Sequence, residues 1–435
     1  MRMICMNLHQ ATSITGGTLI GKPIQFRGVS TDSRSDCAGK LFIALKGENF
    51  NGEDYCQQAI DNGAVAVAVS SSQDINSPQL IVEDSLKALS ILAKNWAKQC
   101  QTKIIAITGS NGKTTVKNMI HSILSVSNQC SATKGNLNNE IGVPLTLCQI
   151  NAKDKYAIVE MGAAKLGDIS WLVSLVDIHT AVITNVSPAH IGRFGSFENI
   201  VSEKGQILST LGKEDYAVLP IDDEHFAIWN KNTISKVISF GESAHADVSI
   251  DTIQEINLPI AGKHNQINAA CASAIAQSCK IKATDILTGL EDFLPAKGRL
   301  ENLGEYNGNT LINDCYNANP QSVKAAIDVL ASYDSPTTLV LGNMAELGEE
   351  SENLHREIGS YAKQKDISRL LTIGIDSNYA ASAYGSQGKH FDSIKLLSDF
   401  MHKNWSSLGT ILVKGSRSMK LENLIETLIN SEKAA

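Results

Sequence analysis

The chain has 435 residues, of which 43% are hydrophobic and 19% charged, which is the balance of an ordinary folded protein with two or three domains. Its formal net charge of −7 argues against nucleic acid as a partner, because phosphate backbones select basic surfaces. No apolar run approaches the length of a membrane helix, and nine singly placed cysteines indicate reduced thiols rather than a disulfide or zinc framework.

The first 98 residues are predicted to form a small α/β domain. They begin without the basic-then-apolar pattern of a secretory signal, because Asn7, His9 and Gln10 interrupt it, and this predicts a cytoplasmic protein. Short apolar strands are expected at 42–45, 64–69 and 80–82, with a helix at 54–62. A helical stretch at 85–98 leads out of this block.

Two further blocks, 99–302 and 303–435, continue the alternation of strands and helices, which predicts layers with largely parallel sheets. Strands are expected at 103–108, 156–161, 180–184 and 216–219, and later at 338–341, 370–373 and 410–413. Residues 295–309, with Pro295, Gly298, Gly304 and Gly308, read as a connector. A last helix has a buried face, formed by Leu421, Leu424, Ile425, Leu428 and Ile429.

A phosphate-binding loop is predicted where strand 103–108 meets a helix that begins at about Thr114. Glycines let backbone N–H groups converge on an anion, and the helix N-terminus adds positive partial charge. Lys113 can reach the β- and γ-phosphates, and the Thr114 hydroxyl suits Mg²⁺. The spacing Gly-x-x-Gly-Lys-Thr is shorter than the eight-residue Walker pattern, and the competing interpretation is a plain strand-to-helix turn. The residues concerned are Gly109, Ser110, Asn111, Gly112, Lys113, Thr114 and Thr115.

Three other polar residues are candidates for the same site. Glu160 ends strand 156–161, where parallel sheets bind ligands, so it is a candidate Mg²⁺ ligand or a cap of the next turn. His190 follows strand 180–184, but a lone loop histidine is more often a surface or packing residue. Lys204, judged by its neighbours alone, is a solvated charge on a helix.

Taken together, the motifs resemble the Mur ligases over nearly the whole chain. The stretches 314–320 and 344–348 look like the branch that adds D-alanyl-D-alanine. The chain departs from the family at Glu53, at 191–193, and at Glu203 and Gln206, which flank Lys204 where Ala and Glu are usual. The likeness is carried by residues 30–34, 44–47, 108–115, 133–144, 160–162, 189–190, 194–196, 262–265, 268, 298–301, 314–320, 342–348 and 413–417.

The resemblance implies three α/β domains and a ligase. A small N-terminal domain at 1–98 would bind UDP, a central parallel-sheet P-loop-type ATPase domain at 99–302 would bind ATP, and a C-terminal Rossmann-like domain at 303–435 would bind a dipeptide. The expected reaction joins D-alanyl-D-alanine to UDP-N-acetylmuramoyl-tripeptide through an acyl phosphate, in peptidoglycan precursor synthesis. ATP and Mg²⁺ would be the cofactors, and the protein is expected to be a monomer without a membrane or nucleic-acid partner.

The resemblance also implies roles for individual residues. Residues 109–115 would hold the ATP phosphates together with Arg299, and Lys204 falls where the family carries a carbamylated lysine. Metal ligands would be Thr114, Glu160 and His190, and the catalytic group would comprise Lys113, Lys204, His190 and Arg299. Asn265 and Asn268 would meet the adenine and Asp314 the ribose, while Ser33 and Asn49 would contact UDP and Asn136, Asn138 and Asn139 the muramoyl side.

Several alternatives stay open at this point. A sister ligase that adds a single amino acid, or an enzyme like folylpolyglutamate synthase, would use the same phosphate chemistry. A nucleotide-dependent kinase or switch protein would leave residues 136–139 and the third block unexplained. A binding-only relative would not need Lys113, Thr114, Glu160, His190 and Arg299 together.

Overall fold

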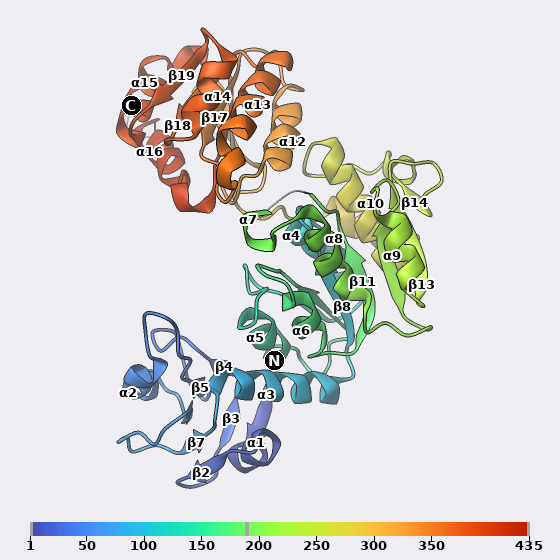
Figure 1. Cartoon of the computed structure of the whole chain (residues 1–435), viewed down its shortest axis with the longest axis vertical. Helices are drawn as coiled ribbons and strands as arrows, with labels where there is room; N and C mark the ends of the chain where they lie inside the picture. The colour runs from blue at the N-terminus through green and yellow to red at the C-terminus, as the bar shows by residue number, and fades with distance from the viewer. Residues whose placement is uncertain (1–2, 188–190, 433–435) are drawn as a thin grey trace.

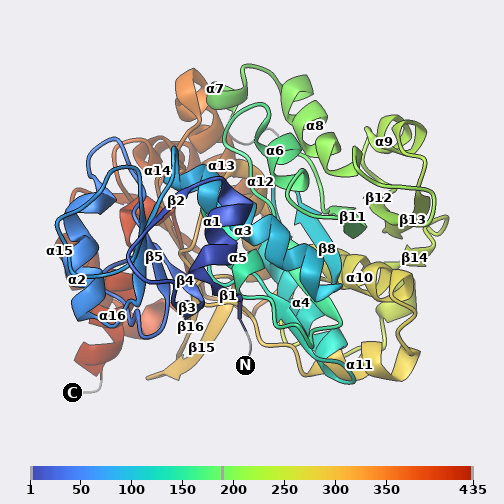
Figure 2. The same cartoon turned by 90° about the horizontal axis from the view of Figure 1, so that it is seen from below.

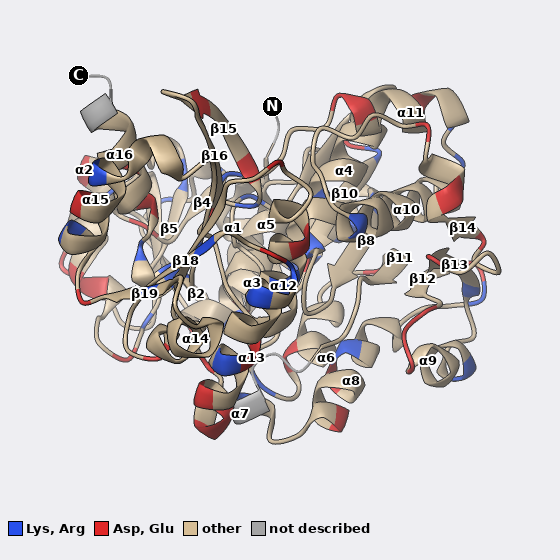
Figure 3. Cartoon of the chain, turned by 90° about the horizontal axis from the view of Figure 1, so that it is seen from above, with Lys and Arg blue, Asp and Glu red and all other residues tan. Residues whose placement is uncertain are grey.

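The computed structural model describes residues 3–187 and 191–432, which form three α/β parts along the long axis of the molecule (Figure 1). The N-terminal part lies at one end, the central part in the middle and the C-terminal part at the other end. Basic and acidic residues are interspersed over the elements of all three parts (Figure 3). Among the residues described, no helix is both long enough and apolar enough to cross a bilayer.

The N-terminal part is built on a five-stranded sheet in the order β2-β7-β6-β5-β4, in which only the β2–β7 pair is antiparallel. Strands β1 and β3 pair separately and antiparallel. The strands are β1 (Cys5–Asn7), β2 (Thr18–Ile20), β3 (Gln25–Arg27), β4 (Val29–Ser30), β5 (Leu41–Ile43), β6 (Ala66–Val69) and β7 (Gln79–Ile81), and the helices are α1 (Leu8–Thr15), α2 (Cys56–Asp61) and α3 (Ser85–Cys100).

Helix α3 ties the N-terminal part to the central one. It begins at the side-chain cap of Asp84, which accepts hydrogen bonds from the backbone N–H groups of Leu86 and Lys87. Its buried face belongs to one continuous hydrophobic cluster that also covers one face of the central sheet. The Trp96 indole donates to the Ile150 carbonyl at 2.9 Å. The two parts therefore share a core rather than meeting across a loose linker.

The central part is a seven-stranded, fully parallel sheet in the order β14-β13-β12-β11-β8-β10-β9. Its strands are β8 (Lys103–Thr108), β9 (Cys130–Ala132), β10 (Tyr156–Glu160), β11 (Ile178–Ile183), β12 (Tyr216–Pro220), β13 (Lys236–Gly241) and β14 (Val248–Ser249). Its helices are α4 (Lys113–Ser125), α5 (Gly142–Cys148), α6 (Asp168–Val173), α7 (Ile191–Phe194), α8 (Phe197–Gly205), α9 (Phe226–Asn232), α10 (Lys263–Ser278) and α11 (Ala283–Glu291).

Helices cover both faces of this sheet, which explains why its strands read as continuous apolar runs. Helices α4, α10 and α11 pack on one face around a second hydrophobic cluster, and they lie together in Figure 2. Helices α5, α6 and α8 lie on the other face with α3. Strand β8 sits between β10 and β11, so the segments that follow these three strands meet at one edge of the sheet.

The C-terminal part is a six-stranded sheet in the order β15-β16-β20-β17-β18-β19, parallel except for the β15–β16 pair. Separate hydrophobic clusters fill its two faces. The strands are β15 (Glu301–Tyr306), β16 (Asn309–Asp314), β17 (Thr337–Gly342), β18 (Arg369–Ile373), β19 (Gly388–Phe391) and β20 (Thr410–Lys414), and the helices are α12 (Pro320–Leu330), α13 (Ser351–Gln364), α14 (Ser377–Tyr384), α15 (Ile394–Lys403) and α16 (Glu422–Glu432).

The prediction that residues 295–309 form only a connector is wrong from residue 301 onward. Strands β15 and β16 make a hairpin in which Tyr306 pairs with Asn309. The two residues between them, Asn307 and Gly308, have φ of 46° and 84°, as a type I′ turn requires. The true connection between the central and C-terminal parts is the shorter stretch 292–300.

The other predicted elements form, with shifted ends. The helix expected at 54–62 is split into a 3₁₀ turn, Gly52–Tyr55, and α2. The strand expected to end at 161 stops at Glu160, and helix α4 begins at Lys113 rather than Thr114. Leu421 precedes the last helix, α16. All nine cysteines are free thiols, as the sequence predicts.

Candidate active site

The turn between β8 and α4 contains two glycines that no other residue can replace without a clash. Gly109 and Gly112 have φ of 150° and 81°. A Cβ on Gly109 would lie 1.9 Å from the Thr184 hydroxyl, and one on Gly112 would lie 2.5 Å from the Asn268 side-chain oxygen. The backbone therefore passes between the end of β11 and α10 and leads into the N-terminus of α4, where the first N–H groups have no intrahelical partner and can bind an anion.

The segment after β11 fixes the shape of this turn. The Ser110 N–H donates to the Asn185 carbonyl at 3.0 Å, and the Asn111 N–H donates to the Asn185 side-chain oxygen at 3.0 Å. The Thr184 hydroxyl donates to the Asn111 carbonyl at 2.6 Å. Ser187 and Ser110 exchange further hydrogen bonds. The segment after β11 therefore fixes the conformation of this turn, which does not depend on the turn's own sequence alone.

Lys113, the first residue of α4, folds back over the turn. Its Nζ donates to the Gly109 carbonyl at 2.6 Å and to the Ser110 carbonyl at 3.3 Å. Burial lowers the pKa of Lys113; Glu160 opposes this shift and Arg299 adds to it. Its ammonium group sits in the wall shared by the two cavities described below.

Glu160 lies at the end of β10, 2% exposed, and joins three neighbouring segments. Thr114 Oγ1 donates to Glu160 Oε2 at 3.0 Å, and Asn138 Nδ2 donates to Glu160 Oε1 at 2.9 Å. Lys117 Nζ lies 4.0 Å from Glu160 Oε2 and donates to the Thr133 carbonyl at 2.8 Å. The sequence left open whether Glu160 caps the next turn, and the structure places its carboxylate toward α4 instead.

The oxygen atoms of Thr114 and Glu160 fit a magnesium ion. A hydroxyl and a carboxylate are hard ligands, and Mg²⁺ takes one or two such protein oxygens together with phosphates and water. In the part of the chain that the structure describes, no group of three or more His, Cys, Asp and Glu side chains gathers around one point. His190, the other predicted ligand, lies outside the described residues.

A cavity of about 490 Å³ lies on one side of the turn. Asn265 and Asn268, from the start of α10, enter it, and Asn268 Nδ2 donates to Asn265 Oδ1 at 3.1 Å. The neighbouring His264 also lines it, and burial lowers the pKa of His264 to about 4. These side chains form a neutral, polar and half-enclosed end that suits a flat heterocycle.

The C-terminal part closes the other end of this cavity. The Arg299 guanidinium stacks on the Tyr316 ring at 4.0 Å and donates to Thr114 Oγ1 at 3.1 Å. Asp314 accepts from Lys414 Nζ at 2.6 Å, with both side chains largely buried. The cavity therefore holds a cation near the turn and a buried carboxylate–ammonium pair farther out.

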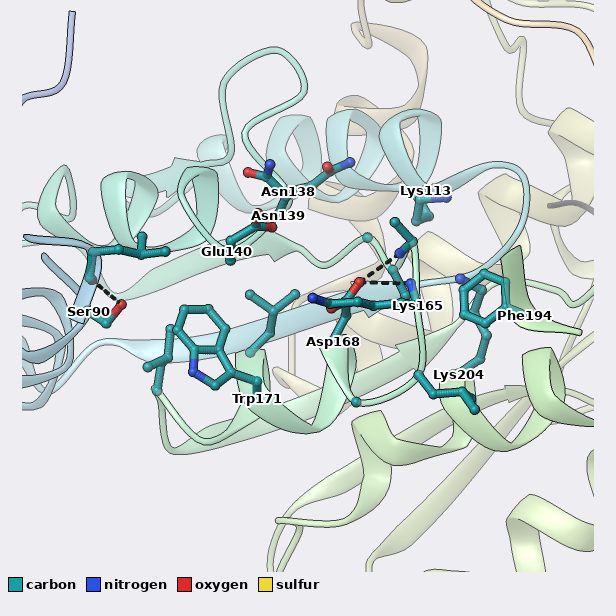
Figure 4. Close-up of a pocket in the computed structure, with 18 of the residues that line it drawn as sticks. Ser90, Lys113, Asn138, Asn139, Glu140, Lys165, Asp168, Trp171, Phe194 and Lys204 are labelled. Atoms are coloured by element: carbon teal, nitrogen blue, oxygen red, sulfur yellow. Dashed lines mark hydrogen bonds between the residues drawn. The ribbon is translucent and has the colours of Figure 1, made fainter. Parts of the chain in front are cut away.

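A larger cavity, of about 1120 Å³, lies on the opposite side of the turn (Figure 4). Its walls come from α3, α6, the segment 162–168 and α8. Figure 4 shows Lys113 and Asn138 on one side of this space and Asp168 and Trp171 on the other, with Lys204 near Phe194. The two cavities share Ser110, Lys113 and Asn138 as lining residues.

Lys204 is not the solvated charge that its sequence neighbours predict. The residue is only 5% exposed, and it lines the larger cavity. Burial lowers the pKa of Lys204 to about 7; the nearby Lys113 lowers it further, while Glu203 and Asp168 oppose the shift. A substantial fraction of this amine is therefore neutral, and hence nucleophilic, near pH 7.

Comparison with known families places three matches in succession along the chain. The model of the "Mur ligase family, catalytic domain" matches residues 25–103, that of the "Mur ligase middle domain" matches 107–276, and that of the "Mur ligase, glutamate ligase domain" matches 298–417. UDP-N-acetylmuramoyl-tripeptide–D-alanyl-D-alanine ligases from Escherichia coli and Haemophilus influenzae are each 37% identical, covering 98% of this chain and 99% of the relative.

The chain belongs to the Mur ligase family. Among solved structures, crystal structure I of MurF from Acinetobacter baumannii superposes with a TM-score of 0.90 at 30% identity and covers 99% of this chain and 100% of the other. The three-part fold of this Mur ligase is therefore that of its structural relatives.

The structure brings most of the predicted site residues of this Mur ligase together and leaves a few apart. Residues 110–115 line the smaller cavity with Asn136, Asn138, Glu160, Asn265, Asn268, Arg299 and Asp314. Asn139 lines the larger cavity, where its side chain also caps the start of α5. Ser33 is buried and donates to Gln58, and Asn49 is exposed; both lie in the N-terminal part and line neither cavity.

Several residues that line or brace the site of this Mur ligase have no role assigned from the sequence, although Asn319 and Lys414 fall in stretches that carry the family likeness. Lys117 pairs with Glu160 one helical turn after Lys113, and Lys414 pairs with Asp314 across the C-terminal sheet. Asn319 and Gln321, at the start of α12, bind the Asn111 side chain at 2.8 and 3.1 Å. For Lys117, the visible signal was its i, i+4 spacing from Lys113, since this spacing puts both side chains on the same helix face.

Proposed function

We propose that this Mur ligase joins D-alanyl-D-alanine to UDP-N-acetylmuramoyl-tripeptide at the expense of ATP, as a monomer in the cytoplasm, during peptidoglycan precursor synthesis. The proposal rests on one observation: two cavities with largely different lining residues meet at Lys113, in a chain related over its whole length to UDP-N-acetylmuramoyl-tripeptide–D-alanyl-D-alanine ligases. ATP would occupy the smaller cavity and the muramoyl tripeptide the larger one. The incoming dipeptide would approach from the C-terminal part.

The chemistry requires that a carboxylate be activated before an amine can attack it. The terminal carboxylate oxygen of the tripeptide attacks the γ-phosphorus of ATP, which gives an acyl phosphate and releases ADP. The amine of the dipeptide then attacks the acyl carbon and loses a proton. The tetrahedral intermediate expels inorganic phosphate, which keeps the original carboxylate oxygen.

The first step brings two anions together, so neutralising their charge is the main task of the protein. Lys113 and Arg299 lie on either side of Thr114 and supply positive charge at the start of α4. Because both cations are held in half-buried positions, these side chains need little reorganisation as negative charge develops during phosphoryl transfer. Thr114 and Glu160 would hold Mg²⁺, with His190 at a second metal site, and the metal would supply a further compensating positive charge.

The remaining substrate contacts follow from the two cavities. Asn265 and Asn268 would bind the adenine and Asp314 the ribose, and Asn136, Asn138 and Asn139 would contact the muramoyl side. Ser33 and Asn49 would hold the UDP part in the N-terminal domain, 1–98, while domains 99–302 and 303–435 would bind ATP and the dipeptide.

Lys204 would be carbamylated in the active enzyme. Carbamylation needs a neutral amine, and the pKa of Lys204, lowered by burial to about 7, provides one near neutral pH. The carbamate would replace a cation that repels Lys113 with an anion that attracts it. Enzyme equilibrated with ¹³C-bicarbonate should give a carbamate carbon signal that the Lys204→Met variant lacks. Identical spectra for the two proteins would contradict this assignment.

Phosphate release tests the whole proposal. With UDP-N-acetylmuramoyl-tripeptide and ATP, release should require D-alanyl-D-alanine and should not be supported by single amino acids. Release with single amino acids alone would instead favour a sister ligase. When the tripeptide carboxylate is labelled with ¹⁸O, one label should pass into the released phosphate, and unlabelled phosphate would rule out the acyl-phosphate route.

The Lys113→Ala variant gives the sharpest prediction for the catalytic site. Removing the ammonium should lower kcat by about 10²–10³-fold, the magnitude expected for a single electrostatic group at a developing charge. Exposed Lys153, in the loop before β10, is the matched control, and its change to alanine should leave turnover unaltered. Normal turnover by Lys113→Ala with a normal circular dichroism spectrum would refute the assigned role.

A further inference from the structure

Glu203 is a buried acid that the reaction scheme above does not use. It lies on α8 directly before Lys204 and is 3% exposed. Its Oε1 accepts from the Ile169 N–H at 2.7 Å and its Oε2 accepts from the Gly167 N–H at 2.8 Å. Both carboxylate oxygens are therefore engaged by backbone groups of another segment, at the start of α6.

Helix α6 needs this acceptor because it has no cap of its own. The residue before its first turn is Gly167, with φ of 92° and no side chain to accept from the free N–H groups. Glu203 supplies the missing acceptor from α8, and its negative charge faces the positive end of the α6 dipole. A carboxylate in this position satisfies the Ile169 N–H, which would otherwise be buried without a partner, and the more exposed Gly167 N–H.

The segment before α6 is held in the same way by a second acid. Asp168 Oδ2 accepts from the N–H groups of Ala164 and Lys165 at 2.8 and 3.0 Å, shown as dashed lines in Figure 4. Asp168 belongs to the segment itself, so it sets the local shape of the turn. Glu203 comes from outside, so it sets where that turn lies relative to α8.

Both partners of this contact are walls of the larger cavity. Residues 162–168 follow Glu160 and line the cavity, and α8 carries Lys204 into it. Successive residues on a helix point about 100° apart, so Glu203 can bind α6 while Lys204 faces the cavity. The carboxylate thereby fixes the position of the Lys204 helix against the adjoining wall 162–168.

We infer that Glu203 is a positioning residue for the acceptor substrate: it joins the segment 162–168 to α8 and so fixes these two adjoining walls of the larger cavity relative to each other. The inference rests on the proposed function only in taking the muramoyl tripeptide as the occupant of that cavity. Glu203 touches neither the smaller cavity nor the turn 109–112. Its loss should therefore affect the acceptor and spare ATP.

The test compares Glu203→Ala with Glu198→Ala, a change of an exposed acid on the same helix. The KM for UDP-N-acetylmuramoyl-tripeptide should rise about tenfold in Glu203→Ala, as expected when the buried Ile169 N–H is left unpaired and the Gly167 contact is lost, while the KM for ATP stays within about twofold. Amide exchange measured by mass spectrometry should lose protection in the peptide covering residues 163–172. Glu198→Ala should match the wild type in all three measurements.

Two results would overturn the inference: an unchanged acceptor KM in Glu203→Ala, or equal rises in both KM values, which would indicate general loosening. If Glu203→Ala does not fold, Glu203→Gln carries the test, because its amide accepts from only one of the two N–H groups and keeps the side-chain volume. The same split between the two KM values is then expected. A wild-type enzyme that releases no phosphate would refute the proposed function instead.

Discussion

Lys113 and Lys204 show how strongly the surroundings of a residue decide its chemistry. Both are lysines in the central part that line the larger cavity, yet Lys113 lies against the carbonyl groups of the turn 109–112 and Lys204 is buried on α8. A bound phosphate would offer Lys113 a better acceptor than the two carbonyls it now contacts. For Lys204, burial next to a second cation favours the neutral amine.

The lowered pKa of Lys204 leads to a prediction about stability and pH. Between about pH 7 and the ordinary lysine pKa of 10.5, Lys204 binds a proton in the unfolded chain but not in the folded chain. The stability of the fold therefore rises with pH across this window. Below about pH 7, the folded protein carries the full free-energy cost of a buried ammonium group. The Lys204→Met variant lacks that penalty, so in bicarbonate-free buffer its Tm should exceed that of the wild type.

The size of this difference should depend on pH. The gain in Tm should be largest near about pH 6 and should shrink toward about pH 10, close to the ordinary lysine pKa of 10.5, above which the wild-type amine is neutral in both states. The matched control is Lys153→Met at an exposed position, which should show no such trend. A gain of the same size at both pH values would show that the amine is not perturbed in the folded protein.

At the scale of single elements, the strand–turn–helix unit of β8 and α4 was predictable because its signals are local. A continuous apolar run, two glycines and a helical apolar face lie next to one another in the sequence. The β15–β16 hairpin was equally local, and its Asn307-Gly308 turn was missed because the glycines around it were interpreted as a loop. The burial of Lys204 and Lys117 could not be predicted, since it depends on helices distant in sequence.

The turn 109–112 gives a prediction at this scale. Gly109→Ala places a methyl group 1.9 Å from the Thr184 hydroxyl, whose hydrogen bond to the Asn111 carbonyl must then break or shift. The KM for ATP should rise about tenfold or more, because the backbone N–H groups no longer converge on one point. Gly135→Ala is the control, since a Cβ at that exposed glycine meets nothing within 4 Å and its φ of 54° adds only backbone strain. An unchanged ATP KM in Gly109→Ala would contradict the need for glycine there.

At the scale of the whole molecule, the C-terminal part touches the turn 109–112 directly. Asn319 and Gln321 bind the two ends of the Asn111 amide, and Arg193 of α7 pairs with Glu346 beyond β17 at 2.6 Å. Closure around both substrates would exclude water, which would otherwise hydrolyse the acyl phosphate. The stretch 292–300, with Gly298 at φ of 70°, is the hinge that we propose for this motion.

Small-angle scattering tests this closure. The radius of gyration of the wild type should fall when a non-hydrolysable ATP analogue and the muramoyl tripeptide are added together. The double variant Asn319→Ala, Gln321→Ala should contract less at the same ligand concentrations, because the contacts to Asn111 are gone. Arg193→Ala should contract like the wild type, since exposed ion pairs contribute only about 0–1 kcal/mol. No contraction in the wild type would refute the hinge.

The two cavities on either side of Lys113 have a practical consequence. They share Ser110, Lys113 and Asn138, so a single small molecule can bridge them over one short distance. When a nucleotide-like group and a peptide-like group are joined in one molecule, binding of the second group becomes intramolecular. The overall affinity can then exceed the affinity of either group alone. Resistance by substitution at the bridge would have to alter Ser110, Lys113 or Asn138, and turnover is expected to depend on Lys113.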